Sequence, residues 1–135
     1  MTASAYRHHL RLYVLADRVA VCRLDAAAPF PPWVDGSGFV SISRTAAELS
    51  VVCAADRVPP GAKAERDYAV IGVEGPLAPE LVGVLASLAA PLADAGIPIL
   101  AIGTYDTDYI LVRDATLDRA VGALRAAGHD VVAGV

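Results

Sequence analysis

The chain has 135 residues, of which 56% are hydrophobic, and a formal net charge of −4. This length and composition suffice for one ordinary domain, or two very small ones, with a real hydrophobic core. Lys63 is the single lysine, and the arginines form no cluster. A nucleic-acid-binding surface is therefore excluded, because phosphate binding needs concentrated positive charge.

The mean hydropathy of +0.50 raises the question of a membrane span. The most apolar stretch, residues 77–102, is long enough to span a bilayer, but it contains Pro91, Gly96, Pro98 and two acidic residues. It breaks naturally into a helix and a strand, so a spanning helix is not expected. The N-terminus has no apolar run of signal-peptide length, and we expect a cytoplasmic protein with no membrane partner.

The first half of the chain predicts four short strands, separated by segments that cannot form long helices. The segment 25–38 is rich in proline and glycine, which excludes a long helix there. Cys22 and Cys53 lie in apolar strand-like runs, and we expect both to be buried core thiols rather than a disulfide or reactive groups. The predicted strands span residues 9–15, 19–24, 39–43 and 49–54.

A polar segment separates the two halves. RVPPGAKAERD, residues 57–67, carries two prolines, a glycine and five charged residues. This composition is typical of a linker. We therefore expect two tightly associated modules, residues 1–66 and 67–135.

The second half is more regular. It begins with a predicted strand at 68–74 and a helix whose apolar residues recur at three and four: Leu81, Val84, Leu85, Leu88 and Leu92. Strands at 97–103 and 108–113 follow. A second helix, from Asp114 as N-cap to Gly128, leads to a last strand at 129–133. Pro91 should kink or end the first helix. This order is the split βαβ unit of ferredoxin-like folds, with both helices on one face of a four-stranded antiparallel sheet.

A shift of sixty residues relates the two halves. SISRTAAELSVVC, residues 41–53, then lies on AIGTYDTDYILVR, residues 101–113, and Glu48 falls at the place of Asp108. Residues 10–14 likewise fall on 70–74. The predicted fold class is α+β, with two fused ferredoxin-like modules of which the first has shortened helices.

These segments resemble a known family. PLADAGIPILAIGTYDTDYILVRDATL is similar to the APLA…STYxTDFILVRxxDL pattern of the Castor family of cytosolic arginine sensors, and FVSISRTAAELSVVC resembles their FFSLTxTPEDYTLMV segment. The similarity covers roughly residues 9–127. Those sensors are built of ACT domains, as are the regulatory regions of aspartate kinases, and they bind amino acids between paired modules. The resemblance implies half a sensor, since the eukaryotic proteins hold four modules and this chain holds two.

The residues themselves suggest how an amino acid would be held. Free N–H groups at Glu80 and Leu81, in the first turn of the predicted helix, could take a carboxylate. Gly83, placed inside that helix, suggests a close approach by a ligand or, equally, close packing. The connector GTYDTD supplies hydroxyls from Thr104 and Tyr105 and the Asp106 and Asp108 carboxylates for an ammonium. Thr and Asp are also ordinary turn residues, so a purely structural role stays open.

The resemblance implies a more specific site. It places one wall on Leu77, Ala78, Leu81, Val82, Gly83, Val84, Thr104, Tyr105 and Asp108, and an opposing wall from a neighbouring module on Ala95, Pro98 and Ile99. The sensors' ligand-holding module has a glutamate where this chain has Leu81, which favours a smaller or less polar amino acid than arginine. Because the walls come from different modules, we expect a homodimer.

Two other classes of function remain as alternatives. His8 and His9 are adjacent, so in a strand their side chains point to opposite faces and cannot bind one metal together. The sequence has no GxSxG, P-loop or HExxH motif. We therefore expect no enzyme, no catalytic residue, no metal and no cofactor. A metal-dependent enzyme using Asp106 and Asp108 is the minor alternative. A protein-recruitment module is the other, with Trp33 either an exposed anchor or a cover for the first module's sheet. The favoured function is an amino-acid-binding regulatory protein that passes its occupancy to a regulated protein partner.

Overall fold

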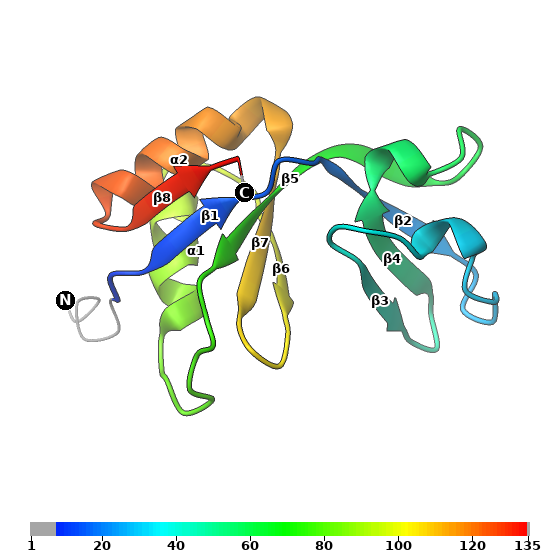
Figure 1. Cartoon of the computed structure of the whole chain (residues 1–135), viewed down its shortest axis with the longest axis horizontal. Coiled ribbons are helices and arrows are strands. Elements are labelled where there is room, and N and C mark those ends of the chain that lie inside the picture. The colour runs from blue at the N-terminus through cyan, green and yellow to red at the C-terminus, as the bar shows by residue number, and fades with distance from the viewer. Residues whose placement is uncertain (1–7, 135) are drawn as a thin grey trace. The chain divides into compact units, whose positions relative to one another are not determined.

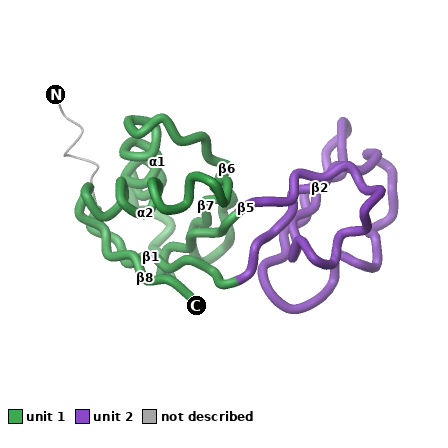
Figure 2. Tube along the Cα trace, turned by 90° about the horizontal axis from the view of Figure 1, so that it is seen from above, with its two compact units in different colours: residues 1–16, 69–135 green, residues 17–68 purple. Residues whose placement is uncertain are grey.

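The computed structural model describes residues 8–134, which divide into two compact units (Figure 1, Figure 2). Unit 1 contains residues 8–16 together with 69–134, and unit 2 contains residues 17–68. In the described part of the chain no helix is long and apolar enough to cross a membrane. The fold is α+β, as the sequence predicted.

Unit 1 is built on a mixed sheet in the strand order β8–β1–β5–β7–β6. Strand β1 pairs antiparallel with β5 and parallel with β8, and β6 pairs antiparallel with β7. The strands are β1 (Arg11–Val14), β5 (Ala64–Val73), β6 (Leu100–Gly103), β7 (Asp108–Arg113) and β8 (Asp130–Ala133).

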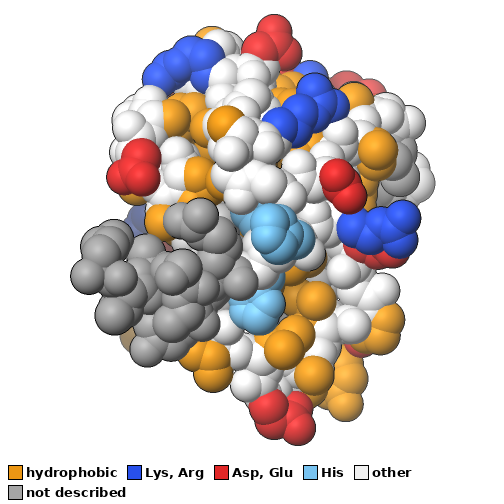
Figure 3. Space-filling model, turned by 90° about the vertical axis from the view of Figure 1, so that its left-hand side faces the viewer, with side chains coloured by type: hydrophobic (Ala, Val, Ile, Leu, Met, Phe, Trp, Pro, Cys, Tyr) orange, Lys and Arg blue, Asp and Glu red, His pale blue; other side chains and the backbone are white. Residues whose placement is uncertain are grey.

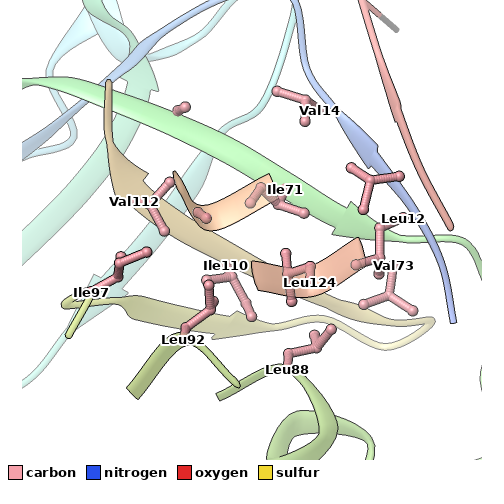
Figure 4. Packing of buried hydrophobic residues seen from close by; sticks show 13 residues of the cluster. Leu12, Val14, Ile71, Val73, Leu88, Leu92, Ile97, Ile110, Val112 and Leu124 are labelled. Atoms are coloured by element: carbon pink, nitrogen blue, oxygen red, sulfur yellow. The ribbon is translucent and has the colours of Figure 1, made fainter. Parts of the chain in front are cut away.

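Both helices of unit 1, α1 (Val84–Asp94) and α2 (Leu117–Ala126), cover the same face of this sheet. Alternate strand residues such as Ile71 and Ile110 meet Leu88 and Leu92 of α1 and Leu124 of α2 in one buried cluster (Figure 4). Each of these side chains is fully buried, and burying one contributes about 1.5–3 kcal/mol. The predicted helix-on-sheet arrangement is thus present in unit 1.

Strand β1 corrects the predicted domain division. The sequence placed it in a first module ending at residue 66, but it lies between β5 and β8 in unit 1 (Figure 1). The predicted four-stranded sheet is therefore five-stranded. Leu12 and Val14 explain the placement, because both side chains are buried in the core of unit 1. The alternation of β1 predicts a half-buried strand but not which strands it pairs with.

Strand β5 begins at Ala64, so the last residues of the predicted linker are part of a strand. Its early part pairs with β2, and its residues 71–73 pair with β1. The predicted start at Tyr68 is wrong because the exposed residues Glu65 and Asp67 alternate with half-buried neighbours, a pattern that also fits a strand.

Helix α1 departs from the prediction at both ends. It begins at Val84 and continues through Pro91 to Asp94, so Pro91 does not end it. Pro91 has no N–H to donate to the carbonyl of Ser87, but the buried ring of His129 donates to that carbonyl instead, with an Nε2–O distance of 3.0 Å. A side chain from another element therefore restores the hydrogen bond that the proline removes.

Helix α2 begins three residues later than predicted. A single 3-10 turn, η4 (Asp114–Thr116), precedes it, and Thr116 rather than Asp114 is the N-cap. No side chain caps this helix, and the Thr116 hydroxyl donates to the Arg113 carbonyl. The predicted end is close, since Gly128 follows the helix with a φ of 101°.

Unit 2 consists of strands and 3-10 turns. Strand β4 (Leu49–Ala54) pairs antiparallel with β3 (Ser41–Arg44) and β2 (Val19–Leu24), and β2 pairs with the early part of β5. Within the described residues of unit 2, the turns η2 (Pro32–Val34) and η3 (Ala55–Arg57) stand in place of α-helices. Unit 2 is therefore not a complete copy of the βαββαβ module.

Trp33 lies in η2 and is half-buried. It packs against a cluster that contains Cys22, Leu49 and Cys53. The indole therefore covers the sheet of unit 2, which is the second of the two alternatives for Trp33, and both cysteines are free and buried.

Candidate functional site

The connector GTYDTD is a hydrogen-bonded turn between β6 and β7. The Thr104 N–H donates to the Thr107 carbonyl at 2.8 Å, and the Thr104 hydroxyl both donates to that carbonyl and accepts the Thr107 N–H. The buried Thr107 hydroxyl donates to the Val73 carbonyl at 2.7 Å, at the end of β5. The two threonines thus hold the connector in place through bonds within the protein itself.

The segment after β5 is held beside this connector. The Leu77 N–H donates to the Asp106 carbonyl at 2.7 Å, and the Gly75–Pro76 peptide bond is cis. A Cβ at residue 75 would lie 3.1 Å from the Asp106 carbonyl oxygen, which is closer than ordinary contact. Glycine at this position therefore permits the close approach of the two segments.

The start of α1 differs from the sequence prediction. Gly83 is the N-cap, in the left-handed region with a φ of 85°, and does not lie inside the helix. The free N–H groups of the first turn belong to residues 84–86 instead of Glu80 and Leu81, since the Leu81 N–H donates to the Ala78 carbonyl. Glycine is required here by backbone conformation, which neither sequence explanation had considered.

A cavity of about 170 Å³ lies between the connector and the segment that leads into α1. Seven of the twelve predicted site residues line it: Leu77, Ala78, Leu81, Val84, Thr104, Tyr105 and Asp108. Pro79, Asp106 and Thr107 line it as well, although only Asp106 had been considered. The Thr-x-x-Thr spacing of a closed four-residue turn was the available signal for Thr107.

The other five predicted residues do not line this cavity. Val82 and Gly83 lie at the start of α1, Ala95 follows its last turn, and Pro98 and Ile99 precede β6. Ala95, Pro98 and Ile99 were assigned to an opposing wall from a neighbouring module, and that assignment stays a prediction.

The two β-hairpins of the chain have the same turn, and this corrects the internal repeat. The last pair before the turn is Arg44 with Leu49 in one hairpin and Gly103 with Asp108 in the other. Thr45 donates to the Glu48 carbonyl just as Thr104 donates to that of Thr107. The structural shift is therefore one residue less than sixty, and Leu49, not Glu48, is the counterpart of Asp108.

Asp108 is the unusual residue of its hairpin. Its counterpart Leu49 is fully buried, whereas Asp108 is half-buried at the cavity wall. A Cβ on Gly103, its cross-strand neighbour, would lie 3.5 Å from Asp108 Oδ1. Within residues 8–134 the carboxylate accepts no hydrogen bond and forms no ion pair. It can therefore serve as an acceptor for a cationic or N–H group.

A second, larger hollow of about 610 Å³ lies at the start of β1 and β8 in unit 1 and contains none of the predicted residues. Its charged side chains include Arg11 and Glu74, an exposed ion pair at 3.7 Å. Across the described ranges no three His, Cys, Asp or Glu side chains are placed to hold a metal ion.

Comparisons with known proteins place this geometry in a family. An ACT-domain family model matches residues 63–126, and a second model, described as an N-terminal domain, matches residues 17–61. No curated protein matches the chain.

Solved structures extend the likeness to both units. Protein Atu0741 from Agobacterium tumefaciens is 35% identical, with a TM-score of 0.90 over 95% of this chain and 96% of that one. The regulatory subunit of aspartate kinase from Thermus thermophilus is 15% identical, with a TM-score of 0.54 over 82% and 93% of the two chains. Aspartate kinase from Clostridium acetobutylicum is 10% identical, with a TM-score of 0.67 over 92% of this chain and 36% of the enzyme.

The two aspartate kinase structures show the shared fold alone, whereas the family model and Atu0741 carry sequence similarity as well. The chain is therefore an ACT-domain protein and belongs to the same family as Atu0741 from Agobacterium tumefaciens.

Proposed function

We propose that this protein is a regulatory amino-acid-binding protein whose ligand occupies the cavity beside Asp108. The observation that carries the proposal is that the Asp108 carboxylate, which has no hydrogen bond or ion pair within the described residues, lines the same cavity as Val84, the first residue of α1. An α-amino acid presents an ammonium and a carboxylate a few ångströms apart, and it needs complementary groups at that spacing.

Two parts of the chain at this cavity suit the two charges of the ligand. The free N–H groups at residues 84–86 and the helix dipole favour the carboxylate. Asp108 would accept charge-assisted hydrogen bonds from the ammonium. The Thr104 hydroxyl is already engaged within its turn, so Asp108 is the side chain that we expect to select for the ammonium.

The cavity favours a small or apolar amino acid. Its volume of about 170 Å³ is below the roughly 300–1,000 Å³ of typical small-molecule sites. Leu81 and Leu77 supply apolar lining and no charge for a basic side chain. Leu81 also stands where the arginine sensors have a glutamate, so arginine is not the expected ligand.

A second copy of the chain would complete the site. Leu81, Val82 and Leu85 are large apolar side chains exposed beside the cavity. Ala95, Pro98 and Ile99 of the second copy would form the opposing wall, so that the ligand is buried between two protomers. Ligand binding would then favour one dimer arrangement over another and report occupancy to a regulated partner.

A panel of the twenty amino acids in a thermal-shift assay, followed by calorimetry on each hit, tests this function. A ligand at one hundred times its Kd stabilises the folded state by about 2.7 kcal/mol. We expect a shift with one or a few small or apolar amino acids. If none of the twenty raises the melting temperature, the protein does not act as an amino-acid sensor, and the recruitment alternative takes its place.

A further inference from the structure

The N-terminal residues of the described chain meet the start of α1 at a cluster of histidines. His8 and His9 precede β1, and His129 lies in the turn before β8. Figure 3 shows histidine side chains beside one another on this face of unit 1. None of them lines the cavity beside Asp108, yet His8 and His129 are both hydrogen-bonded to Ser87 of α1, the helix whose first residue lines the cavity.

His8 is bonded to both sides of the N-cap glycine. Its ring Nε2 lies 2.7 Å from the Val82 carbonyl and must donate, because a carbonyl only accepts. Its backbone N–H donates to the Ser87 hydroxyl at 2.9 Å, and that hydroxyl donates to the Gly83 carbonyl at 2.9 Å. His8 therefore holds Val82, the residue before Gly83, and Ser87, in the first turn of the helix after it.

His129 provides a second attachment of the same segment. The Leu10 N–H donates to Nδ1 at 3.1 Å, and the opposite ring nitrogen donates to the Ser87 carbonyl at 3.0 Å. The ring is 3% exposed. Residues 8–10 are thus connected to the first turn of α1 by one direct and one histidine-mediated route, both of which meet at Ser87.

The segment that these bonds hold has little else to keep it in place. Leu81 is 46% exposed and Val82 is 65% exposed, so burial of side chains contributes little to the order of residues 79–83. Few buried contacts and exposed backbone hydrogen bonds are the features of a segment that opens locally. Loss of the His8 bonds should therefore increase local opening of this segment before it affects the rest of unit 1.

We propose that residues 8–10 form a latch, with His8 as the positioning residue, that holds loop 76–83 closed and thereby sets the affinity of the cavity beside Asp108. The proposal rests on the function proposed above and adds a control point to it. Closing the latch places Leu81 against the ligand, and opening it lets the loop move away. An event that displaces the N-terminal residues would then lower ligand affinity from outside the site.

Hydrogen exchange without ligand tests the latch itself. His8→Ala removes the ring bond to Val82, while His9→Ala is a matched control, because within residues 8–134 the ring of His9 bonds only to Gly128. We expect the hydrogen-bonded amides of Leu81 and Ser87 to exchange roughly five to ten times faster in His8→Ala, the effect of losing about one hydrogen bond, and at the wild-type rate in His9→Ala. His8→Gln, which keeps an N–H donor, should restore part of the protection. Equal exchange in the two alanine variants would overturn the latch.

Calorimetry with the amino acid found in the panel tests its effect on the cavity. We expect His8→Ala to weaken binding by roughly fivefold to tenfold and His9→Ala to leave it unchanged. Equal affinities in the two variants would show that loop 76–83 does not control the site. If the wild-type protein binds no amino acid, the proposed function fails, and the exchange experiment still decides whether the latch exists.

Discussion

At the scale of single residues, the comparison of the two hairpins separates architecture from function. Thr45 and Thr104 make the same backbone bond in the two turns, so Thr104 is explained by the turn alone. Asp108 is not explained in this way, because the equivalent position holds the buried Leu49. A carboxylate at the position of a core leucine does not stabilise the fold by packing. Asp108 is therefore the strongest candidate for a ligand contact.

Asp108→Ala should abolish the thermal shift produced by the amino acid while leaving the unliganded melting temperature nearly unchanged. The carboxylate makes no hydrogen bond or ion pair within the described residues, so its removal costs the fold little. Glu48→Ala, in the other hairpin, is the matched control and should keep the full shift. A normal shift in the Asp108 variant would remove this residue from the site.

Cys22 belongs to the core of unit 2, and its thiol should therefore react slowly with alkylating reagents. Burial, with a smaller contribution from Cys53, raises the pKa of the Cys22 thiol to about 11, so deprotonation is moved to higher pH. At pH 8 only on the order of one thiol in a thousand would be the reactive thiolate. Alkylation should be slow in the native protein, accelerate toward pH 11, and become fast at pH 8 in denaturant. Rapid native labelling at pH 8 would contradict this burial.

At the scale of elements, the periodicity of apolar residues predicts both helices of unit 1, but not their ends. The start of α1 depends on the left-handed conformation of Gly83, and its continuation through Pro91 depends on His129. Both depend on contacts with residues distant in the sequence. The strands 19–24, 49–54 and 108–113 have the predicted bounds.

The ring of His129 donates to the Ser87 carbonyl of α1 in place of a backbone N–H at Pro91. We therefore expect the effects of substitutions at His129 and Pro91 to depend on each other. His129→Phe should destabilise the protein by on the order of 1–3 kcal/mol, because the Leu10 N–H and the Ser87 carbonyl lose their partner. In a Pro91→Ala background residue 91 can donate to that carbonyl, and the cost of the histidine change should fall by about half. Denaturant unfolding of the four proteins measures the cycle. Equal costs in both backgrounds would show that His129 does not replace the missing helix bond.

At the scale of the whole molecule, the chain pairs strands from distant parts of the sequence. β1 lies in unit 1 with β5 and β8, although unit 2 occupies the sequence between β1 and most of β5. The predicted boundary at residue 66 assumed that neighbours in sequence share a module. The family matches, at 17–61 and 63–126, fall close to the observed units but leave β1 outside both.

The fold class, the core faces of strands and helices, and most residues of the cavity wall could be predicted from the sequence. These depend on local periodicity, turn chemistry and a specific motif resemblance, which can all be read along the chain. The three-dimensional contacts were needed to show that β1 joins unit 1, that Asp108 corresponds to Leu49, and that His8 and His129 hold the start of α1. Strand partners, register and long-range hydrogen bonds depend on which surfaces meet in three dimensions, and a one-residue change of register reverses every side chain without altering the pattern.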